Sequence, residues 1–158
     1  MIVHPIPPLF NEKSRILILG SFPSVKSREA AFFYGHPQNR YWTVISRILG
    51  FDKPETVEEK RKMMLENGIA MWDVIASCEI EGSSDSSIRN VTANDLSVIL
   101  DNCPIEKIFV NGKTAEKYYN KYTYPKTKIK AICLPSTSPA NAAWSIERLI
   151  EAWKIIMT

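Results

Sequence analysis

Short, uninterrupted apolar runs alternate along the chain with segments that carry helix signals. Each run is bounded on at least one side by Gly, Asn or Pro. A run of this kind predicts a strand that is buried on both faces of a sheet. Strands are therefore predicted over residues 15–19, 69–75, 107–110 and 129–134.

The segments between these runs have the starts and stops of helices. Thr56 is followed three residues later by Glu59, which makes a capping box, and Gly50 is a typical helix stop. Apolar side chains near the C-terminus recur at helical spacing. Helices are predicted over residues 40–49, 56–66, 92–102, 114–119 and 142–157, with a polar loop over 78–90 and an extended lead-in over 1–14 that packs through Ile6, Leu9 and Phe10.

Strands that alternate with helices predict an α/β sandwich on a mainly parallel sheet. The predicted strands end at Gly20–Ser21, Asp73, Asn111–Gly112 and Pro135–Ser136. The carboxyl ends of parallel strands share one edge of a sheet, and ligands bind there at a switch in strand order. We therefore expect these four stretches to form one cleft.

The composition narrows the class of protein. With 158 residues, of which 45% are hydrophobic and 23% charged, the chain fits one soluble domain over residues 1–158. No apolar run has membrane-spanning length, and the N-terminus lacks the features of a signal peptide. We expect a cytoplasmic protein with no membrane partner. The net charge of +3 is compatible with a polyanionic partner, although the Lys-rich segments 60–62 and 121–130 are expected to be solvated surface.

The cysteines and histidines do not predict a metal site. Cys78, Cys103 and Cys133 are odd in number and far apart, which argues against a disulfide framework and against zinc or iron–sulfur ligation. His4 and His36 lack the spacing of a ligand pair. No glycine-rich phosphate loop and no nucleophile elbow is present. We expect no metal and no cofactor.

Aromatic and polar side chains follow the first predicted strand. Residues 20–24 and 33–42 are rich in hydroxyls, aromatic rings, Gly and Pro, which suits the wall of a pocket, although an ordinary strand-to-helix loop is an equal alternative. The only carboxylate expected nearby is Asp73. Flat rings surrounded by hydrogen-bonding groups suit a nucleobase.

Two segments resemble the signature motifs of the uracil-DNA glycosylase superfamily. The first joins Gly-Ser-Phe-Pro-Ser at 20–24 to His-Pro-Gln-Asn-Arg-Tyr-Trp at 36–42, and the second is Leu-Pro-Ser-Thr-Ser-Pro-Ala-Asn at 134–141. The branch of DNA-deoxyinosine (hypoxanthine-DNA) glycosylases is the most similar, and the mismatch-specific uracil glycosylases are near relatives. The resemblance implies a three-layer α/β/α sandwich on a central, mainly parallel four-stranded sheet.

The resemblance also implies an activity. It predicts a monofunctional DNA N-glycosylase of base excision repair, which flips out a deaminated base, hypoxanthine first and uracil second, and leaves an abasic site. The expected partner is double-stranded DNA with a deaminated base, with single-stranded DNA as an alternative, and the expected state is a monomer. The rival functions are a non-catalytic DNA-damage sensor, a G/U mismatch-specific uracil glycosylase, and a hydrolase of free nucleosides.

One departure from the family pattern bears on catalysis. Mismatch-specific relatives carry a catalytic Asn at the position of Phe22, which cannot align water. In the deoxyinosine branch the catalytic amide corresponds to Asn39. The alternative role of Asn39 is to cap the helix that opens at Tyr41, and both roles could hold.

The resemblance extends to residues that would bind the base and the DNA. Tyr34 would stack on the flipped base or pack the loop, Asp73 would accept the ring N–H of hypoxanthine or hold loop amides, and Asn111 would bind a base carbonyl or close the strand end. Hydroxyls near the last helix would contact phosphates, beside a wedge that enters the duplex. The predicted base-binding residues are Ser21, Phe22, Tyr34, Asp73 and Asn111, and the predicted DNA-binding residues are Ser24, Ser136, Ser138, Pro139, Ala140 and Asn141.

Overall fold

Four parallel strands form the centre of the computed structural model, which describes residues 1–158. Their order in the sheet is β3-β2-β6-β7. The register places Leu17 beside Ala70 on one side and Ile108 on the other. A strand forms in each of the four predicted segments: β2 (Ile16–Gly20), β3 (Ile69–Asp73), β6 (Lys107–Asn111) and β7 (Ala131–Leu134).

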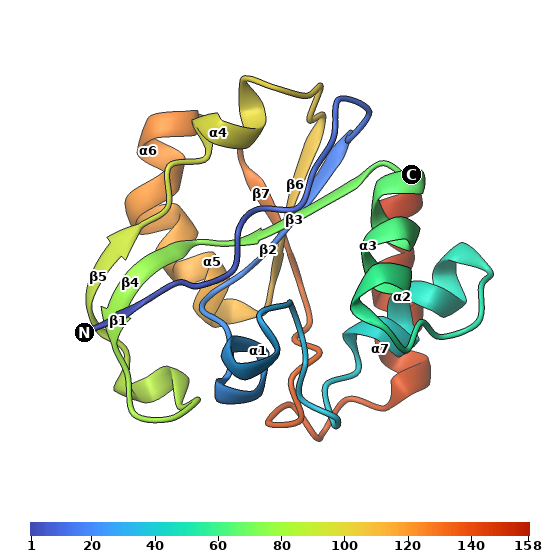
Figure 1. Ribbon diagram of the computed structural model, residues 1–158, viewed down its shortest axis with the longest axis horizontal. Helices are drawn as coiled ribbons and strands as arrows, with labels where there is room; N and C mark the ends of the chain where they lie inside the picture. The colour runs from blue at the N-terminus through green and yellow to red at the C-terminus, as the bar shows by residue number, and fades with distance from the viewer.

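Helices cover both faces of this sheet (Figure 1). One face carries α2 (Tyr41–Leu49), α3 (Val57–Glu66) and α7 (Ile146–Trp153), and the other carries α4 (Ser97–Leu100), α5 (Lys113–Tyr118) and α6 (Tyr124–Thr127). Successive strand side chains point to opposite faces, so Ile18 joins one core and Leu17 and Leu19 the other. The predicted three-layer α/β/α sandwich is confirmed.

The local signals that were predicted to bound two helices act as expected. Thr56 accepts a hydrogen bond from the Glu59 backbone N–H at 3.1 Å and opens α3. Gly50 ends α2 with φ at 81°, a left-handed conformation that glycine adopts without steric cost. Ile6 and Leu9 of the lead-in are buried as predicted, and Leu9 forms an isolated bridge with Met71.

A second, antiparallel sheet was not predicted. It consists of β1 (Ile2–Val3), β4 (Ile75–Glu79) and β5 (Arg89–Ala93), in the order β1-β4-β5. The prediction of one strand over 69–75 is wrong, because the chain turns at Val74, whose N–H donates to the Gly20 carbonyl. The predicted loop over 78–90 is also partly strand.

Several helix boundaries differ from the prediction. The helix after β6 continues beyond residue 119 through a π-helical turn, η2 (Tyr119–Thr123), into α6. The last helix begins at Ile146, because Ser145 caps it by accepting from the Arg148 N–H, and it ends in a 3₁₀ turn, η3 (Lys154–Met157). Of the predicted helix over 92–102 only α4 forms, and an unpredicted helix, α1 (Val25–Ala30), follows β2. No helix is long and apolar enough to cross a membrane.

Candidate active site

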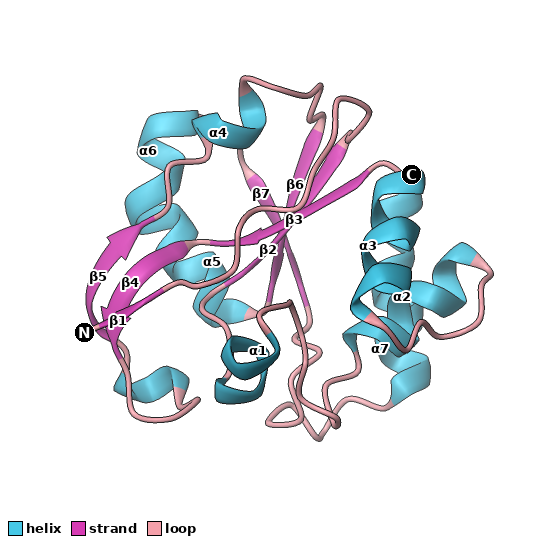
Figure 2. Ribbon diagram, viewed as in Figure 1, coloured by secondary structure: helices cyan, strands magenta, loops and turns pink.

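A cavity of about 320 Å³ lies at the carboxyl ends of β2, β3 and β6. The chain places β3 and β6 on opposite sides of β2, so the strand order switches there, as in other ligand-binding parallel sheets. Loops from distant parts of the chain gather at this end of the sheet (Figure 2). Every predicted site residue except Asn141 lines the cavity. Asn141 lines a neighbouring hollow that shares Ser136, Ser138 and Ala140 with it.

Gly20 lets two polar groups approach the end of β2. The sheet register pairs Gly20 with Asp73. A Cβ atom at residue 20 would clash with Oδ1 of Asp73 and would stand 3.0 Å from the Tyr34 hydroxyl. Only glycine therefore allows the carboxylate and the phenol to converge on the cavity wall at this point.

Asp73 is paired with a histidine that sequence analysis did not place in the site. Its Oδ2 lies 2.7 Å from Nε2 of His4, and the side chains of Asp73 and His4 are 5% and 3% exposed. Within the chain, the hydrogen bond of the Asp73 side chain is the one that Oδ2 makes with His4. One oxygen of this buried carboxylate is thus held by the protein, and the other, Oδ1, is left for the cavity.

Tyr34 has an unusual backbone and a buried hydroxyl. Its φ is 52°, a left-handed conformation that is uncommon outside glycine and that marks local strain. The ring stacks on Tyr41 with centroids 4.2 Å apart. Its hydroxyl has no hydrogen-bond partner. Burial raises the pKa of this phenol well above its ordinary value, and the nearby Asp73 carboxylate raises it further. The Asn111 side chain lowers the pKa by a smaller amount. The hydroxyl therefore keeps its proton at neutral pH.

The Asn39 side-chain amide uses its oxygen in a hydrogen bond within the chain and its nitrogen in none. Its Oδ1 accepts a hydrogen bond from the Tyr41 backbone N–H at 2.9 Å, which stabilises the start of α2. Its Nδ2 makes no hydrogen bond within the chain, and the residue lines the cavity. The N-cap of α2 is Arg40, so Asn39 holds the turn just before the helix and is not its cap, and the geometry is compatible with a second contact of Asn39 inside the cavity.

Asn111 joins the end of β6 to the loop after β7. Its Nδ2 donates to the Thr137 hydroxyl at 3.0 Å, and its Oδ1 accepts the Thr137 backbone N–H at 3.1 Å. Thr137 is fully buried. This pair of bonds matches the alternative role expected for Asn111, which is to close the end of its strand. A contact with a base would use the second N–H of Nδ2 or the second lone pair of Oδ1.

Arg40 fixes the shape of the 137–144 loop. Its guanidinium donates to the backbone carbonyls of Ser138 at 3.2 Å, Asn141 at 3.0 Å and Trp144. Its backbone N–H donates to the Thr137 carbonyl at 3.1 Å. No role was predicted for Arg40, although it lies within the first motif, because its partners lie about a hundred residues away.

The polar side chains of the same loop bond to the loop itself. Ser136 accepts from the Ser138 N–H and Ser138 from the Ala140 N–H, both at 3.1 Å. The Asn141 amide donates to the Ser136 carbonyl at 3.0 Å. Each serine oxygen is used as an acceptor, so its own O–H remains available to donate to an external anion.

Comparison with known proteins agrees with this geometry. The model of the uracil DNA glycosylase superfamily matches residues 7–156. The chain belongs to this superfamily. A relative from Methanosarcina acetivorans, named hypoxanthine DNA glycosylase, is 34% identical over 158 residues, which cover 99% of this chain and 98% of that protein.

Two further comparisons cover much of the chain. A hypoxanthine DNA glycosylase of Methanosarcina barkeri is 34% identical over 114 residues, 71% of this chain and 72% of that protein. The solution NMR structure of a candidate uracil DNA glycosylase from Methanosarcina acetivorans superposes with a TM-score of 0.81 at 30% identity and covers 100% of both chains.

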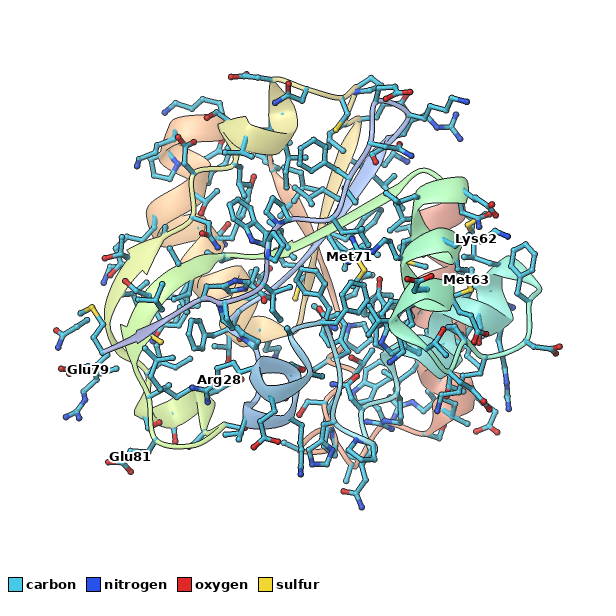
Figure 3. All side chains as sticks on the ribbon, viewed as in Figure 1. Arg28, Lys62, Met63, Met71, Glu79 and Glu81 are labelled. Carbon is cyan, nitrogen blue, oxygen red and sulfur yellow. The ribbon has the colours of Figure 1, made fainter.

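Within this uracil DNA glycosylase fold, a loop between β4 and η1 (Asp85–Ser87) forms a lip of the cavity. The Val25 N–H donates to the Ser83 hydroxyl at 2.9 Å, and Arg28 of α1, labelled in Figure 3, donates to the Gly82 carbonyl at 2.7 Å. Ser24, a predicted DNA contact, caps α1 by accepting the Ser27 N–H at 3.1 Å.

Asp85 stands at the mouth of both hollows and was assigned no role from the sequence. Although the residue is exposed, partial desolvation of its carboxyl raises the pKa, and the Thr114 hydroxyl opposes this shift. In the sequence, Asp85 could be noticed only because it lies in a polar loop near Ser83. Nothing in the sequence indicates that this loop packs on α1.

Proposed function

We propose that this protein is a monofunctional DNA glycosylase of base excision repair that removes deaminated bases, hypoxanthine first and uracil second, and leaves an abasic site. One observation carries the proposal: residues from both signature motifs line a single cavity at the switch point of the sheet. Membership of the superfamily and the relatives named hypoxanthine DNA glycosylases support it.

The cavity suits a base that has left the duplex. An enzyme that acts on a base in double-stranded DNA must extrude the nucleotide before it can reach the glycosidic bond. Asp73 Oδ1 would accept the ring N–H of hypoxanthine, and the Tyr34 ring would stack on the base. Tyr41 covers one face of the Tyr34 ring and holds the ring in place, which reduces the entropy lost on binding.

Asn39 would act on the reacting groups. When the glycosidic bond breaks, C1′ of the sugar becomes oxocarbenium-like, the base nitrogen takes the bonding electrons, and a water oxygen then bonds to C1′ and releases a proton. The Tyr41 contact orients the Asn39 amide, so its Nδ2 would donate to the departing base. Preorganised neutral donors stabilise such developing charge without changing protonation.

The loop held by Arg40 would contact the DNA backbone. The Ser136 and Ser138 hydroxyls have a free O–H, and Pro139 and Ala140 lie beside them at the rim. We expect this rim to bind double-stranded DNA around the extruded nucleotide, as a monomer, with phosphate contacts that fix position rather than sequence.

One specific feature supports a second candidate, a non-catalytic protein that binds damaged DNA. Phe22 occupies the position of the catalytic Asn of mismatch-specific relatives, and its apolar ring, 9% exposed, cannot align water. The second candidate therefore requires that Asn39 does no chemistry.

The test is release of abasic sites from duplexes that each hold one hypoxanthine, uracil or xanthine. We expect fastest release of hypoxanthine, slower release of uracil, and no strand cleavage without alkali. Binding of lesion duplexes with no release from any of them would favour the second candidate. Faster hydrolysis of free deoxyinosine than of the inosine duplex would instead identify a nucleoside hydrolase.

A further inference from the structure

We propose that His4 is a positioning residue for base selection, which holds the Asp73 carboxylate so that Oδ1 faces the ring N–H of the extruded base. The inference rests on the proposed function and adds a residue from outside both signature motifs. It names the ring N–H beside a carbonyl as the group that Oδ1 accepts, which hypoxanthine, uracil and xanthine carry and adenine and cytosine lack. Guanine and thymine carry it too, so this contact selects against adenine and cytosine alone.

The second sheet carries His4 to Asp73, which lines the cavity. Ile2 pairs with Cys78 and Val3 with Ser77, and the His4 N–H then donates to the Ala76 carbonyl at 2.7 Å. Figure 1 shows β1 alongside β4, away from the parallel sheet. The first residues of the chain are thus a structural part of the site.

Two aromatic rings flank the His4 imidazole, whose two nitrogens each make a hydrogen bond. Its ring meets Phe22 edge-on at 5.9 Å between centroids and Trp72 at 6.4 Å. An apolar ring would fill the same space, so packing alone does not require a histidine here. The polar atoms of the ring serve two bonds, to Asp73 and to the Ile6 backbone.

These two bonds fix which nitrogen carries the proton. The Ile6 backbone N–H can only donate, and it approaches Nδ1 of His4 at 3.2 Å, so Nδ1 is an acceptor without a proton. In the neutral ring the proton is then on Nε2, which donates to Asp73 Oδ2 at 2.7 Å. The Asp73 oxygen that faces His4 is an acceptor in this bond.

The consequence for Asp73 is an oriented acceptor inside the cavity. A buried carboxylate without a partner is costly and would take up a proton or move toward water. The His4 donor removes that need and leaves Oδ1, beside Gly20, as a hydrogen-bond acceptor. A base whose ring nitrogen carries a hydrogen satisfies Oδ1, whereas a ring nitrogen with a lone pair leaves two acceptors facing each other.

The test combines substitutions at residues 4 and 73 in the full-length protein. His4→Phe keeps an aromatic ring and removes the donor, and His4→Gln restores a donor of similar reach. Asp73→Asn is made alone and together with His4→Phe. Val3→Thr is the matched control, because Val3 is 69% exposed on the same strand. The measurements are single-turnover release of hypoxanthine from an inosine duplex, the half-saturating protein concentration and the thermal midpoint.

We expect His4→Phe to slow the single-turnover rate about ten- to a hundredfold and to change half-saturation by less than about threefold, because phosphate contacts dominate duplex affinity. His4→Gln should recover most of the rate, and Val3→Thr should match the wild type. In the Asp73→Asn background, His4→Phe should have no further effect, since His4 acts only through the carboxylate.

Two results would overturn the inference while the proposed function stands. One is an active wild type in which His4→Phe, folded at the assay temperature, releases hypoxanthine at the normal rate. The other is an equal further loss when His4→Phe is added to Asp73→Asn. A wild type that releases no base from any lesion duplex would overturn the proposed function itself, and this inference with it.

Discussion

Oδ1 of Asn39 accepts the backbone N–H of Tyr41 at 2.9 Å, so the residue expected to act on the departing base also holds the start of α2. Asn39→Ala should therefore lose two contributions at once. We expect about a hundred- to thousandfold loss in single-turnover release of hypoxanthine, and a loss of about 1 kcal/mol in the free energy of unfolding from the missing hydrogen bond to the Tyr41 N–H.

Asn39→Asp separates these two roles on the same position. A carboxylate still accepts the Tyr41 N–H, and negative charge is favourable at a helix start, so the thermal midpoint should stay near that of the wild type. The donor toward the cavity is lost, so release should fall as in Asn39→Ala. If Asn39→Asp retains near-normal release, the residue orients water through its oxygen and does not donate to the base.

Asp73→Asn should weaken base selection. Hypoxanthine offers a ring N–H where adenine offers a lone pair, and a mismatch of buried polar groups costs roughly 1–3 kcal/mol. The variant should therefore narrow the gap in release rate between hypoxanthine and adenine, mainly by slowing release of hypoxanthine. Single-turnover rates on matched inosine and adenosine duplexes measure the ratio, and an unchanged ratio in a folded variant would reduce Asp73 to a structural role.

Gly20→Ala should damage the cavity through a single added carbon. The new Cβ would clash with Asp73 Oδ1 and press on the Tyr34 hydroxyl, and overpacking of this kind costs typically about 1–3 kcal/mol. We expect slower hypoxanthine release together with a lower thermal midpoint. Gly35→Ala is the matched control, because a Cβ there would make contacts of 3.4 Å; equal effects of the two variants would contradict the assignment.

Substitutions in the 137–144 loop should weaken duplex binding more than substitutions in the Lys-rich segment 121–130. Ser138→Ala with Asn141→Ala should lower duplex affinity, because these side chains lie at the rim and also hold the loop in shape. Lys126, Lys128 and Lys130 are exposed near α6, which lies at the other end of the sheet (Figure 1). Their replacement by Gln is the control.

The salt dependence of binding distinguishes the two faces. Each lost phosphate contact should reduce the slope of log affinity against log salt by about 0.9 on duplex DNA. A larger loss of affinity or slope in the Lys variant than in the loop variant would move the DNA face to α6.

Asp85→Asn should stabilise the protein at neutral pH and tighten duplex binding. Partial desolvation raises the folded-state pKa of Asp85 above its ordinary value of 3.8, so the folded protein holds this proton more tightly than the unfolded chain. Stability is then lost as the pH rises from that value through the folded-state pKa. The difference in thermal midpoint between Asp85→Asn and the wild type should grow over this window, and an equal difference at about pH 3 and pH 7 would contradict it.

The central sheet could be predicted because its strands are buried on both faces and therefore appear as apolar runs, as Ile69–Asp73 does. Arg89–Ala93 could not, because Arg89, Asn90 and Thr92 are exposed and leave no apolar pattern. The meeting of Ser21, Asp73 and Asn111 followed from the edge that parallel strands share, whereas Asn39 was predicted from the resemblance to the superfamily. His4 and Arg40 were missed because their roles depend on partners about seventy and a hundred residues away, which no local spacing encodes.

The Arg40 contacts also set when the site can exist during synthesis. Ser138, Asn141 and Trp144 follow β2, β3 and β6 along the chain, so a nascent chain that already contains these strands still lacks the carbonyls that orient this guanidinium. Because Arg40 and its carbonyl partners lie about a hundred residues apart in the sequence, the 137–144 loop takes its shape only after the residues beyond β7 have been synthesised.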